Sequence, residues 1–330
     1  MSQKPIIRVR KLRKLFPIRR GFLSSFFTKE ELFIHAVDNV SFDINTDEVL
    51  GLVGESGCGK TTLGRLLIRL LEPTSGEIYF NDTNIVSLSQ SEMRKLRPKM
   101  QIIFQDPYES LNPRMTVLDL VSEPLEVNDL VENDAEKEEK VAEILESVRL
   151  TPPEDFMFRY PHELSGGQRQ RIAVARALII HPDFVVADEP VSMLDTSTRG
   201  EVLNLMIELK TLTRSYLFIT HELAVARHFC DRIAIMYLGR IMEMASSDEI
   251  VKNPVHPYTR ALLEATPVPN PKARREKVNI KGEVISPINP PRRCRFYTRC
   301  LMAEEICSRL EPELVDIGGG HVVACHLNQG

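Results

Sequence analysis

The octapeptide GESGCGKT, Gly54 to Thr61, constrains the fold of this chain more than any other segment. It matches the pattern G-x-x-x-x-G-K-[ST] of a phosphate-binding loop. The apolar run VLGLV precedes it and predicts a buried strand, and KTTLGRLLIRLL follows it and predicts a helix. Glycines let the backbone curl until several N–H groups point at one anion, which the helix N-terminus also attracts. This context predicts a nucleotide phosphate site.

Two side chains of this loop carry specific chemistry. Lys60 can reach the β- and γ-phosphates of a nucleotide, and the Thr61 hydroxyl is a candidate Mg²⁺ ligand. Cys58 occupies a variable position of the motif and is interpreted as a bystander. The remaining candidate nucleotide-binding positions of the segment are Gly54, Ser56, Gly57, Gly59 and Thr62.

A second polar group follows the apolar segment FVVADE, which predicts a buried strand that ends in two acids. Asp188 is the candidate carboxylate for Mg²⁺, directly or through water. Glu189 is then placed to orient or deprotonate the attacking water, a task worth ~10²–10⁴ in rate. Without the phosphate loop, such a pair is more often a surface turn.

Length and composition narrow the class further. The 330 residues allow one large domain and a small one, and a net charge of -4 gives no reason to expect nucleic-acid binding. No apolar run reaches the ~18 residues of a membrane span. The start, MSQKPIIRVRKLRK, has no stretch like that of a signal peptide, so a cytosolic chain is expected. Alternating strand and helix patterns predict an α/β fold with a mostly parallel sheet.

Three further segments indicate what kind of nucleotide-binding protein this is. LSGGQRQR, which begins at Leu164, is a second glycine-rich turn opening a helix, and thus a second anion site. One nucleotide has no use for two such sites in one chain, whereas a dimer would use both. FQDP supplies Gln105, and FITHE supplies His221 directly after a predicted strand.

In this order and spacing the motifs resemble those of the ATP-binding subunits of ABC transporters. The resemblance covers residues 6–265 and implies a P-loop NTPase (RecA-like) core with an antiparallel β-subdomain and an α-helical subdomain at about 106–178. These form a nucleotide-binding domain over 1–265. Residues 266–330 are expected to form a small irregular, cysteine-rich C-terminal domain, because TPVPNP and SPINPP are proline-rich and without regular period.

The resemblance also implies roles for individual residues in a head-to-tail ATP sandwich. Glu189 is the catalytic base, His221 holds the γ-phosphate and the water, and Gln105 senses the γ-phosphate and ligates Mg²⁺ with Thr61 and Asp188. The remaining nucleotide-contacting residues that it implies are Phe16, which stacks on adenine, Ser165, Gly166, Gly167 and Gln168 toward the partner's ATP, and Asp195. The segment Val191–Ser192–Met193 departs from the usual family pattern. We expect this departure to adjust the rate of ATP hydrolysis and not to abolish it.

A narrower resemblance concerns the substrate. QDPYESLNPRMTV, RYPHELSGGQRQRIAVARALI, NPVHPYTRALLEATP and SPINPPRRCRFYTRC resemble segments of the dipeptide/oligopeptide importer ATPases. This implies an ATP hydrolase on the cytoplasmic face of the membrane, paired with itself or a related ATPase. Its partners would be two permease subunits and, indirectly, an external solute-binding protein. A nickel or other small-solute importer and a non-transport ABC ATPase acting on nucleic acid are the alternatives.

Four cysteines gather near the C-terminus, Cys294, Cys300, Cys307 and Cys325. A reducing compartment disfavours disulfides, and the wide spacing fits neither zinc pairs nor ferredoxins. A four-cysteine zinc site, free thiols and an iron–sulfur cluster remain open on the residues alone. Resemblance to peptide-importer ATPases, some of which carry such a cluster here, favours a 4Fe-4S cluster. His321 and His326 are possible substitute ligands.

Two smaller features complete the interpretation. GFLSSFF, Gly21 to Phe27, is weighed as a membrane or partner contact against an ordinary loop packed on the domain, which is favoured. Cys230 in HFCDRI is expected in the core.

Overall fold

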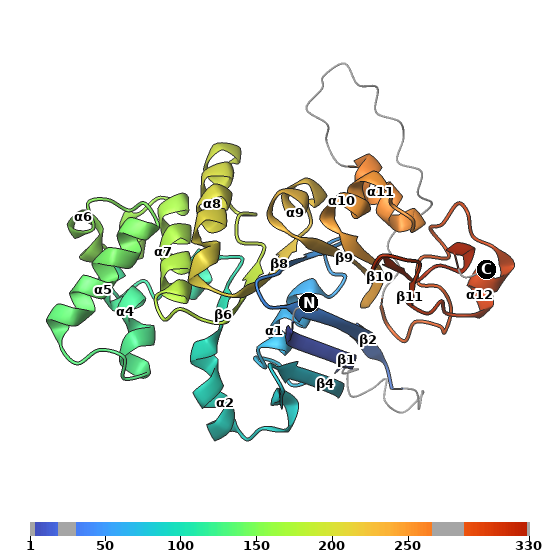
Figure 1. Cartoon of the computed structure of the whole chain (residues 1–330), viewed down its shortest axis with the longest axis horizontal. Coiled ribbons are helices and arrows are strands. Elements are labelled where there is room, and N and C mark those ends of the chain that lie inside the picture. The colour runs from blue at the N-terminus through green and yellow to red at the C-terminus, as the bar shows by residue number, and fades with distance from the viewer. Residues whose placement is uncertain (1–3, 19–30, 266–286, 329–330) are drawn as a thin grey trace, which may run out of the picture. The chain divides into compact units, whose positions relative to one another are not determined.

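The structure is a computed structural model that describes residues 4–18, 31–265 and 287–328 (Figure 1). The described chain forms two compact units. The first contains residues 45–49 and 87–219 with the described residues up to Ile6, and the second contains 7–44, 50–86 and the chain from 220 onward. Each unit contains strands, helices and part of the predicted site.

The first unit is built on three parallel strands, β6 (Met100–Ile103), β7 (Phe184–Asp188) and β8 (Ser215–Thr220), with β7 between the other two. Every residue of β7 and β8 is buried, as expected for strands covered on both faces. The register places Asp188 beside Ile219. The apolar runs that predicted two of these strands are therefore confirmed as interior strands.

Helices make up the rest of the first unit, and Figure 1 shows α4 to α7 grouped together. α4 packs against α5 and α7 and begins at a capping box, in which Thr116 and Asp119 bond each other's backbone N–H groups. Helices α3 to α7 lie in the interval for which a helical subdomain is predicted. The helices of this unit are α2 (Gln90–Leu96), α3 (Pro107–Ser110), α4 (Val117–Val127), α5 (Asp134–Ser147), α6 (Glu154–Met157), α7 (Gly166–Leu178) and α8 (Thr196–Glu208).

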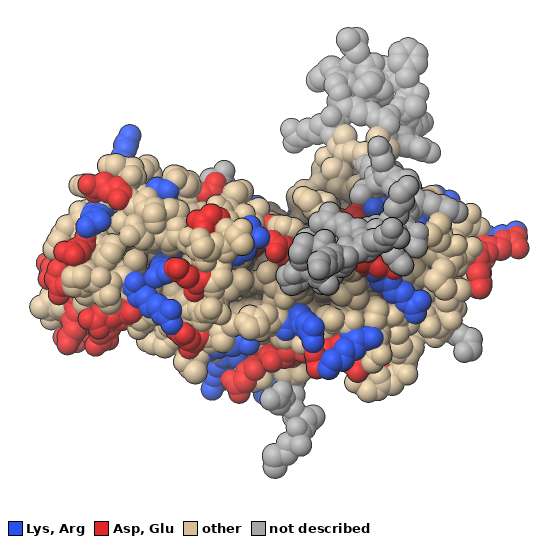
Figure 2. Space-filling model, turned by 90° about the horizontal axis from the view of Figure 1, so that it is seen from above, with Lys and Arg blue, Asp and Glu red and all other residues tan. Residues whose placement is uncertain are grey.

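The acidic run VENDAEKEEK lies largely on α5. Figure 2 shows acidic side chains gathered on the surface at the end of the first unit where this helix lies. Lys140 pairs with Glu136 at 2.8 Å, one turn apart, so the run forms a solvated helix face held partly by its own ion pairs.

The second unit contains an antiparallel sheet of four strands in the order β2 (Phe33–Asn45), β1 (Pro5–Pro17), β4 (Ser75–Phe80) and β5 (Thr83–Asn84). Ile7, Val9 and Leu12 of β1 are fully buried. A register shift between Arg10 and Arg13 changes which positions of β1 face the core. This sheet matches the antiparallel β-subdomain that the family resemblance implies.

Outside the four-stranded sheet, β3 (Val49–Val53) pairs in parallel with β9 (Arg232–Tyr237), and β9 forms a hairpin with β10 (Arg240–Ser246). The sequence RIAIMYLGRIMEMA forms this hairpin. Two short strands, β12 (Val322–Val323) and β11 (Val315–Asp316), extend the sheet beyond β10. The helices of the unit are α1 (Lys60–Leu67), α9 (Leu223–Phe229), α10 (Ser247–Lys252), α11 (Pro257–Ala265) and α12 (Glu305–Arg309).

The C-terminal residues 287–328 have little regular structure and are attached to the sheet by buried polar contacts. Glu243 of β10 is fully buried and accepts hydrogen bonds from the backbone N–H groups of Val255 and His256, at 2.8 and 3.0 Å. Its Oε1 lies 2.7 Å from Nε2 of His321. One carboxylate therefore joins the hairpin, the start of α11 and the C-terminal region.

Some expectations lie outside the described residues. The GFLSSFF segment falls in 19–30, and the TPVPNP linker falls largely in 266–286. Within the described ranges, none of the helices is both long and apolar enough to cross a bilayer. The boundary between the two expected domains, near residue 265, stays a prediction.

Candidate nucleotide and C-terminal sites

The phosphate loop joins β3 to α1 with the backbone conformation that its glycines allow. Gly59 has φ +110°, and a Cβ there would lie 2.0 Å from the carbonyl oxygen of Ala36. A Cβ on Gly54 would lie 2.2 Å from the carbonyl oxygen of Met236. Only glycine fits such contacts. The curl of the loop is thus enforced by β2 and β9, which pack directly against it.

Lys60 begins α1, and its side chain lies inside the loop. Its Nζ donates to the carbonyl oxygens of Gly54 and Glu55 at 2.8 and 3.1 Å. Thr61 and Thr62 follow in the first helical turn and are partly exposed, and Ser56 and Gly57 are exposed. No side chain caps the N-terminus of α1, the end of a helix that attracts anions. The geometry fits a bound phosphate.

Cys58 lies on the buried side of the same loop, and burial raises the pKa of its thiol. A neutral, buried thiol has no contact with a ligand on the exposed side, which agrees with its interpretation as a bystander. Cys230 is likewise buried, at the end of α9, as expected.

Two of the predicted catalytic residues meet in the first unit. Nε2 of Gln105, in the loop after β6, lies 3.4 Å from Oε2 of Glu189, which follows β7. Glu189 has φ +44°, an uncommon conformation for a non-glycine residue, held by its N–H donating to the carbonyl of Ile219 at 3.0 Å. Asp188 before it is buried at the strand end. Gln105 and Glu189, which are 84 positions apart in the sequence, are therefore in contact.

The departure Val191–Ser192–Met193 also has a local explanation. The Ser192 hydroxyl donates to the Glu189 carbonyl at 3.0 Å, Val191 is buried, and Met193 is 63% exposed. Ser192 thus supports the turn that carries Glu189.

The second glycine-rich turn forms the N-terminus of α7. The Ser165 hydroxyl accepts from the Gln168 N–H at 3.3 Å, and Oε1 of Gln168 accepts from the Ser165 N–H at 2.9 Å. Ser165 is exposed and Gly166 partly so, while Gly167 is buried against Thr198. The turn therefore presents an exposed helix N-terminus, the kind of surface that attracts an anion from outside the chain.

Three other predicted residues lie at the ends of helices or strands. Asp195 caps α8, where hydrogen bonds from Ser197 and Thr198 lower the pKa of its carboxyl group. His221 follows β8 in the second unit and is about half exposed. Phe16, near the end of β1, is only partly buried, and the ammonium of Lys14 lies 5.0 Å from the centre of its ring. Phe16 is thus not an ordinary core residue.

A contact to the phosphate loop that sequence reasoning missed comes from the C-terminal region. Nη1 and Nη2 of Arg299 donate to the carboxylate of Glu55 at 2.8 and 3.0 Å, and the Arg299 side chain is 9% exposed. The Tyr258 hydroxyl accepts from the Glu55 N–H at 3.0 Å. Although burial opposes it, the hydrogen bonds to Glu55 and Tyr237 raise the pKa of Arg299. The sequence contains one signal for this contact, namely the acid Glu55 within the phosphate-binding loop. A carboxylate at that place requires a cation to neutralise it.

An aromatic cluster supports this contact. The ring of Phe296 lies 5.5 Å from that of Tyr237 and 5.3 Å from that of Tyr258, and the two tyrosine rings are 4.7 Å apart. All three are fully buried, and burial lowers the pKa of the adjacent His256 to about 3. The segment that contains Cys294 and Cys300 is thus packed behind the phosphate loop.

The four C-terminal cysteines come close together. Cys294, Cys307 and Cys325 are buried and Cys300 is partly so, and the Cys294 N–H donates to the Cys307 carbonyl at 3.1 Å. Burial, with a smaller effect of the other three thiols, raises the pKa of Cys294 to about 12.

Several readings of this end of the chain are corrected. None of the four cysteines forms a disulfide, which excludes the disulfide alternative for this structure. Among the residues that the structure describes, no group of three or more His, Cys, Asp and Glu side chains is placed to hold a metal ion, so neither the zinc alternative nor the expected 4Fe-4S cluster is supported. His321 bonds Glu243, and His326 lies 3.0 Å from the Leu310 carbonyl, so neither is placed as a substitute ligand.

Comparison with known proteins agrees with this geometry. The family model described as "ABC transporter" matches residues 37–192, and the one described as "Oligopeptide/dipeptide transporter, C-terminal region" matches 242–307. The oligopeptide transport ATP-binding protein AppF of Bacillus subtilis is 47% identical over 99% of this chain and 98% of its own length. The dipeptide transport ATP-binding protein DppF of Haemophilus influenzae is 47% identical over 97% and 96%.

A solved structure is similar over the nucleotide-binding part. The ATP-binding cassette MJ0796, a dimer bound to ADP and Pi, has a TM-score of 0.64 and 29% identity, covering 73% of this chain and 98% of that one. With the phosphate loop, the parallel strands and relatives that match from end to end, this chain belongs to the ATP-binding proteins of ABC transporters, in the oligopeptide/dipeptide transporter family.

Proposed function

We propose that this chain is the ATP-hydrolysing motor subunit of a membrane importer for dipeptides or oligopeptides. The observation that carries the substrate class is the match of both the cassette and the C-terminal region to peptide-transport ATP-binding proteins. Their names mention peptides and not nickel or nucleic acid, which favours this function over the two alternatives.

The nucleotide is proposed to bind to the phosphate loop and to several residues outside it. Lys60 neutralises the β- and γ-phosphates, and Phe16 stacks on adenine. Thr61, Gln105 and Asp188 would hold Mg²⁺, which would neutralise charge on the phosphates. The other proposed nucleotide-binding residues are Gly54, Ser56, Gly57, Gly59, Thr62 and Asp195.

Glu189 is proposed as the general base for the attacking water. The Gln105 amide lies within 3.4 Å of its carboxylate and the Ser192 hydroxyl bonds its backbone, so the group is oriented from two sides. His221 is proposed to hold the γ-phosphate and the water. In this proposal Glu189 removes the proton as the water attacks, and positioned donors stabilise the charge that develops on the transferred phosphate.

A second copy or a related ATPase is the proposed dimer partner. The exposed N-terminus of α7, with Ser165, Gly166, Gly167 and Gln168, is the surface proposed to contact the partner's ATP. ATP-driven closure of the pair would move two permease subunits, and an external binding protein would deliver the solute. The chain would then act peripherally, on the cytoplasmic face of the membrane. Residues 1–265 are the proposed nucleotide-binding domain and 266–330 the C-terminal domain.

Arg299 is proposed as a positioning residue for the phosphate loop. An unpaired carboxylate at Glu55 would repel the phosphates, since two charges at about 8–10 Å interact by ~1.5–2 kcal/mol at an effective dielectric near 20. The bidentate contact with Arg299 cancels this charge and orients the side chain.

The C-terminal thiols are proposed to hold a 4Fe-4S cluster that cross-links this irregular region. Four cysteines that form no disulfide, three of them buried, lie where little regular structure is present. A four-iron cube takes one thiolate at each iron, which matches the number of these cysteines. When bound, the cluster would cross-link the region through four thiolates.

Replacing Glu189 tests the catalytic assignment. Glu189→Gln should bind ATP normally but lower kcat for ATP hydrolysis ~10²-fold or more, because the base is lost while the shape is kept. Glu201→Gln, at an exposed position on α8, is the matched control and should retain normal kcat. Near-normal turnover in Glu189→Gln would show that Glu189 is not the base.

Replacing both partners of the Arg299–Glu55 contact tests the positioning role. Arg299→Gln should raise the Kd for ATP about tenfold, ~1.4 kcal/mol, with a smaller effect on kcat. Adding Glu55→Gln should restore most of the affinity, because the unpaired charge is removed. Arg309→Gln removes an exposed ion pair of α12 and serves as control. Equal defects in Arg299→Gln and the double variant would contradict charge neutralisation.

Purification from membranes tests the transport assignment. A tagged copy of the chain should co-purify with two polytopic subunits, and its deletion should abolish uptake of labelled dipeptides or oligopeptides by the cells. A chain that remains apart from membranes, or whose deletion leaves peptide uptake unchanged, would contradict a role in peptide import.

Metal analysis tests the cluster. Anaerobically purified protein should be coloured and contain iron and sulfide in equal amounts. Cys294→Ser should lose iron, whereas Cys230→Ser, which changes a buried thiol elsewhere in the unit, should retain it. Colourless wild-type protein without iron, or with stoichiometric zinc, would overturn this proposal.

A further inference from the structure

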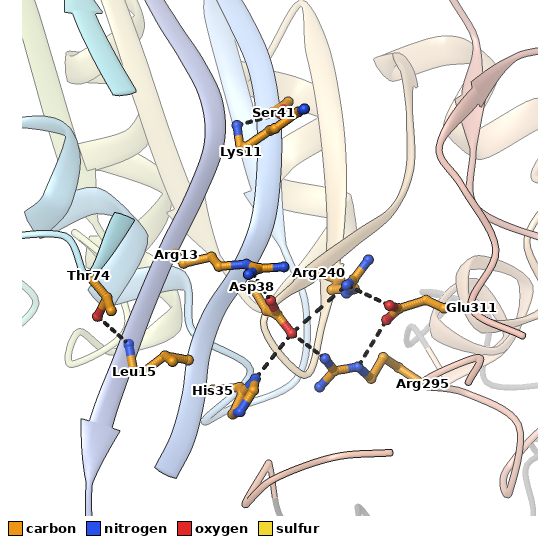
Figure 3. Close-up of polar contacts among 10 residues, drawn as sticks. All are labelled: Lys11, Arg13, Leu15, His35, Asp38, Ser41, Thr74, Arg240, Arg295 and Glu311. Atoms are coloured by element: carbon orange, nitrogen blue, oxygen red, sulfur yellow. Dashed lines mark hydrogen bonds and ion pairs between the residues drawn. The ribbon is translucent and has the colours of Figure 1, made fainter. Parts of the chain in front are cut away.

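A cavity of about 800 Å³ lies in the second unit between strands β1, β2 and β10 and the C-terminal region. Figure 3 shows side chains from β1, β2, β10 and the C-terminal region converging there. Its volume is within the 300–1,000 Å³ usual for small-molecule sites. Unlike most such sites, it is lined largely by charged groups.

The carboxylate of Asp38, a lining residue that is 5% exposed, is the most connected group of this cavity. Nε of Arg13 lies 3.2 Å from its Oδ1, and Nδ1 of His35 lies 3.1 Å from its Oδ2. Nη2 of Arg295 also donates to Oδ2, and Arg240 lies at 3.9 Å (Figure 3). A single acid therefore serves three arginines and a histidine.

A second acid completes the network without balancing it. Glu311 accepts from Nη2 of Arg240 at 2.7 Å and from Nε of Arg295 at 3.4 Å. Three guanidinium groups thus share two carboxylates. Farther out, Lys11 and Arg292 line the cavity with Glu313, so five cationic side chains face three acidic ones.

Two guanidinium groups also have buried N–H groups without a hydrogen-bond partner, namely Nη1 of Arg295 and Nε of Arg240. The Arg295 residue is only 7% exposed. Burial lowers the pKa of Arg240, and the charges of Glu311 and Asp38 do not fully offset it. The buried Arg240 and Arg295 are balanced by Asp38 and Glu311, so the surplus positive charge of the lining comes from the more exposed Arg13, Lys11 and Arg292. Unsatisfied buried donors are costly, and a nearby anion would relieve both the surplus charge and this cost.

We propose that this cavity is a binding site for a small anion that carries a phosphate or carboxylate group. Guanidinium groups bind both oxyanions through paired N–H donors, and an oxyanion would satisfy the donors and the charge at the same time. Arg295 and Arg240 would contact the oxyanion, and the exposed Arg292 and Lys11 would attract it.

The site is separate from the proposed nucleotide site. No residue of the phosphate loop lines the cavity, and Lys11, Arg13 and Leu15 of β1 line it whereas Phe16 does not. A bound anion would join the C-terminal region to the β1–β2 sheet, and so would act as an effector of the cassette and not as its substrate.

Isothermal titration calorimetry on the full chain tests this proposal. Inorganic phosphate and citrate are titrated separately in the presence of Mg²⁺ and a saturating non-hydrolysable ATP analogue, which keeps the phosphate loop occupied. At least one of the two probes should bind with one-to-one stoichiometry. Arg292→Gln, at an exposed position that the fold does not need, should weaken that binding about tenfold, as should Arg295→Gln. Arg309→Gln, outside the cavity, should leave it unchanged.

The outcomes separate the sources of the anion. Binding of phosphate alone indicates a phosphorylated ligand, and binding of citrate alone indicates a carboxylate ligand; both support the site if Arg292→Gln weakens them. Binding that is equal in wild type and Arg292→Gln, or no saturable binding of either probe, overturns the proposal. Because Arg292 has no part in the core, its result holds even if Arg295→Gln fails to fold.

Discussion

The tight curl of the phosphate loop is the constraint on which the other features of the nucleotide site depend. Backbone carbonyls of Ala36 and Met236 lie where side chains would be at Gly59 and Gly54, so the loop can follow only one path between β3 and α1. That path turns N–H groups toward one point and starts α1 at Lys60. A loop of this kind needs rigid strands beside it, and the largely buried strands β3 and β9 supply them.

The C-terminal region extends this support in a way that distinguishes the chain from a plain cassette. Glu243 ties it to β10, and the rings of Tyr237, Tyr258 and Phe296 fill the space behind the loop. Arg299 then bonds an acid of the loop itself. Two segments that resemble those of peptide-importer ATPases, around Tyr258 and Arg299, are thus the ones that reach the phosphate loop.

Much of the fold follows from local patterns that can be recognised in the sequence. Apolar runs that are buried on both faces predicted β3, β7 and β8, and the glycine turn predicted the β9–β10 hairpin. Motif order identified Gln105 and Glu189, which do meet. Spacing alone could not choose among the readings of the four cysteines, because three-dimensional separation of the thiols is not set by the number of intervening residues.

The sequence by itself determined the local chemistry: a phosphate-binding loop, a strand ending in Asp188 and Glu189, and a second capped turn at Ser165. Such features depend on neighbours within a few residues. Tertiary structure decided what joins distant segments. Arg299 and Glu55 are 244 positions apart, and Arg295 and Asp38 are 257 apart. Charges that pair over such separations leave no periodicity or motif in the sequence. Only the folded chain therefore reveals the contact of Arg299 with the phosphate loop and the cavity lined by cationic side chains.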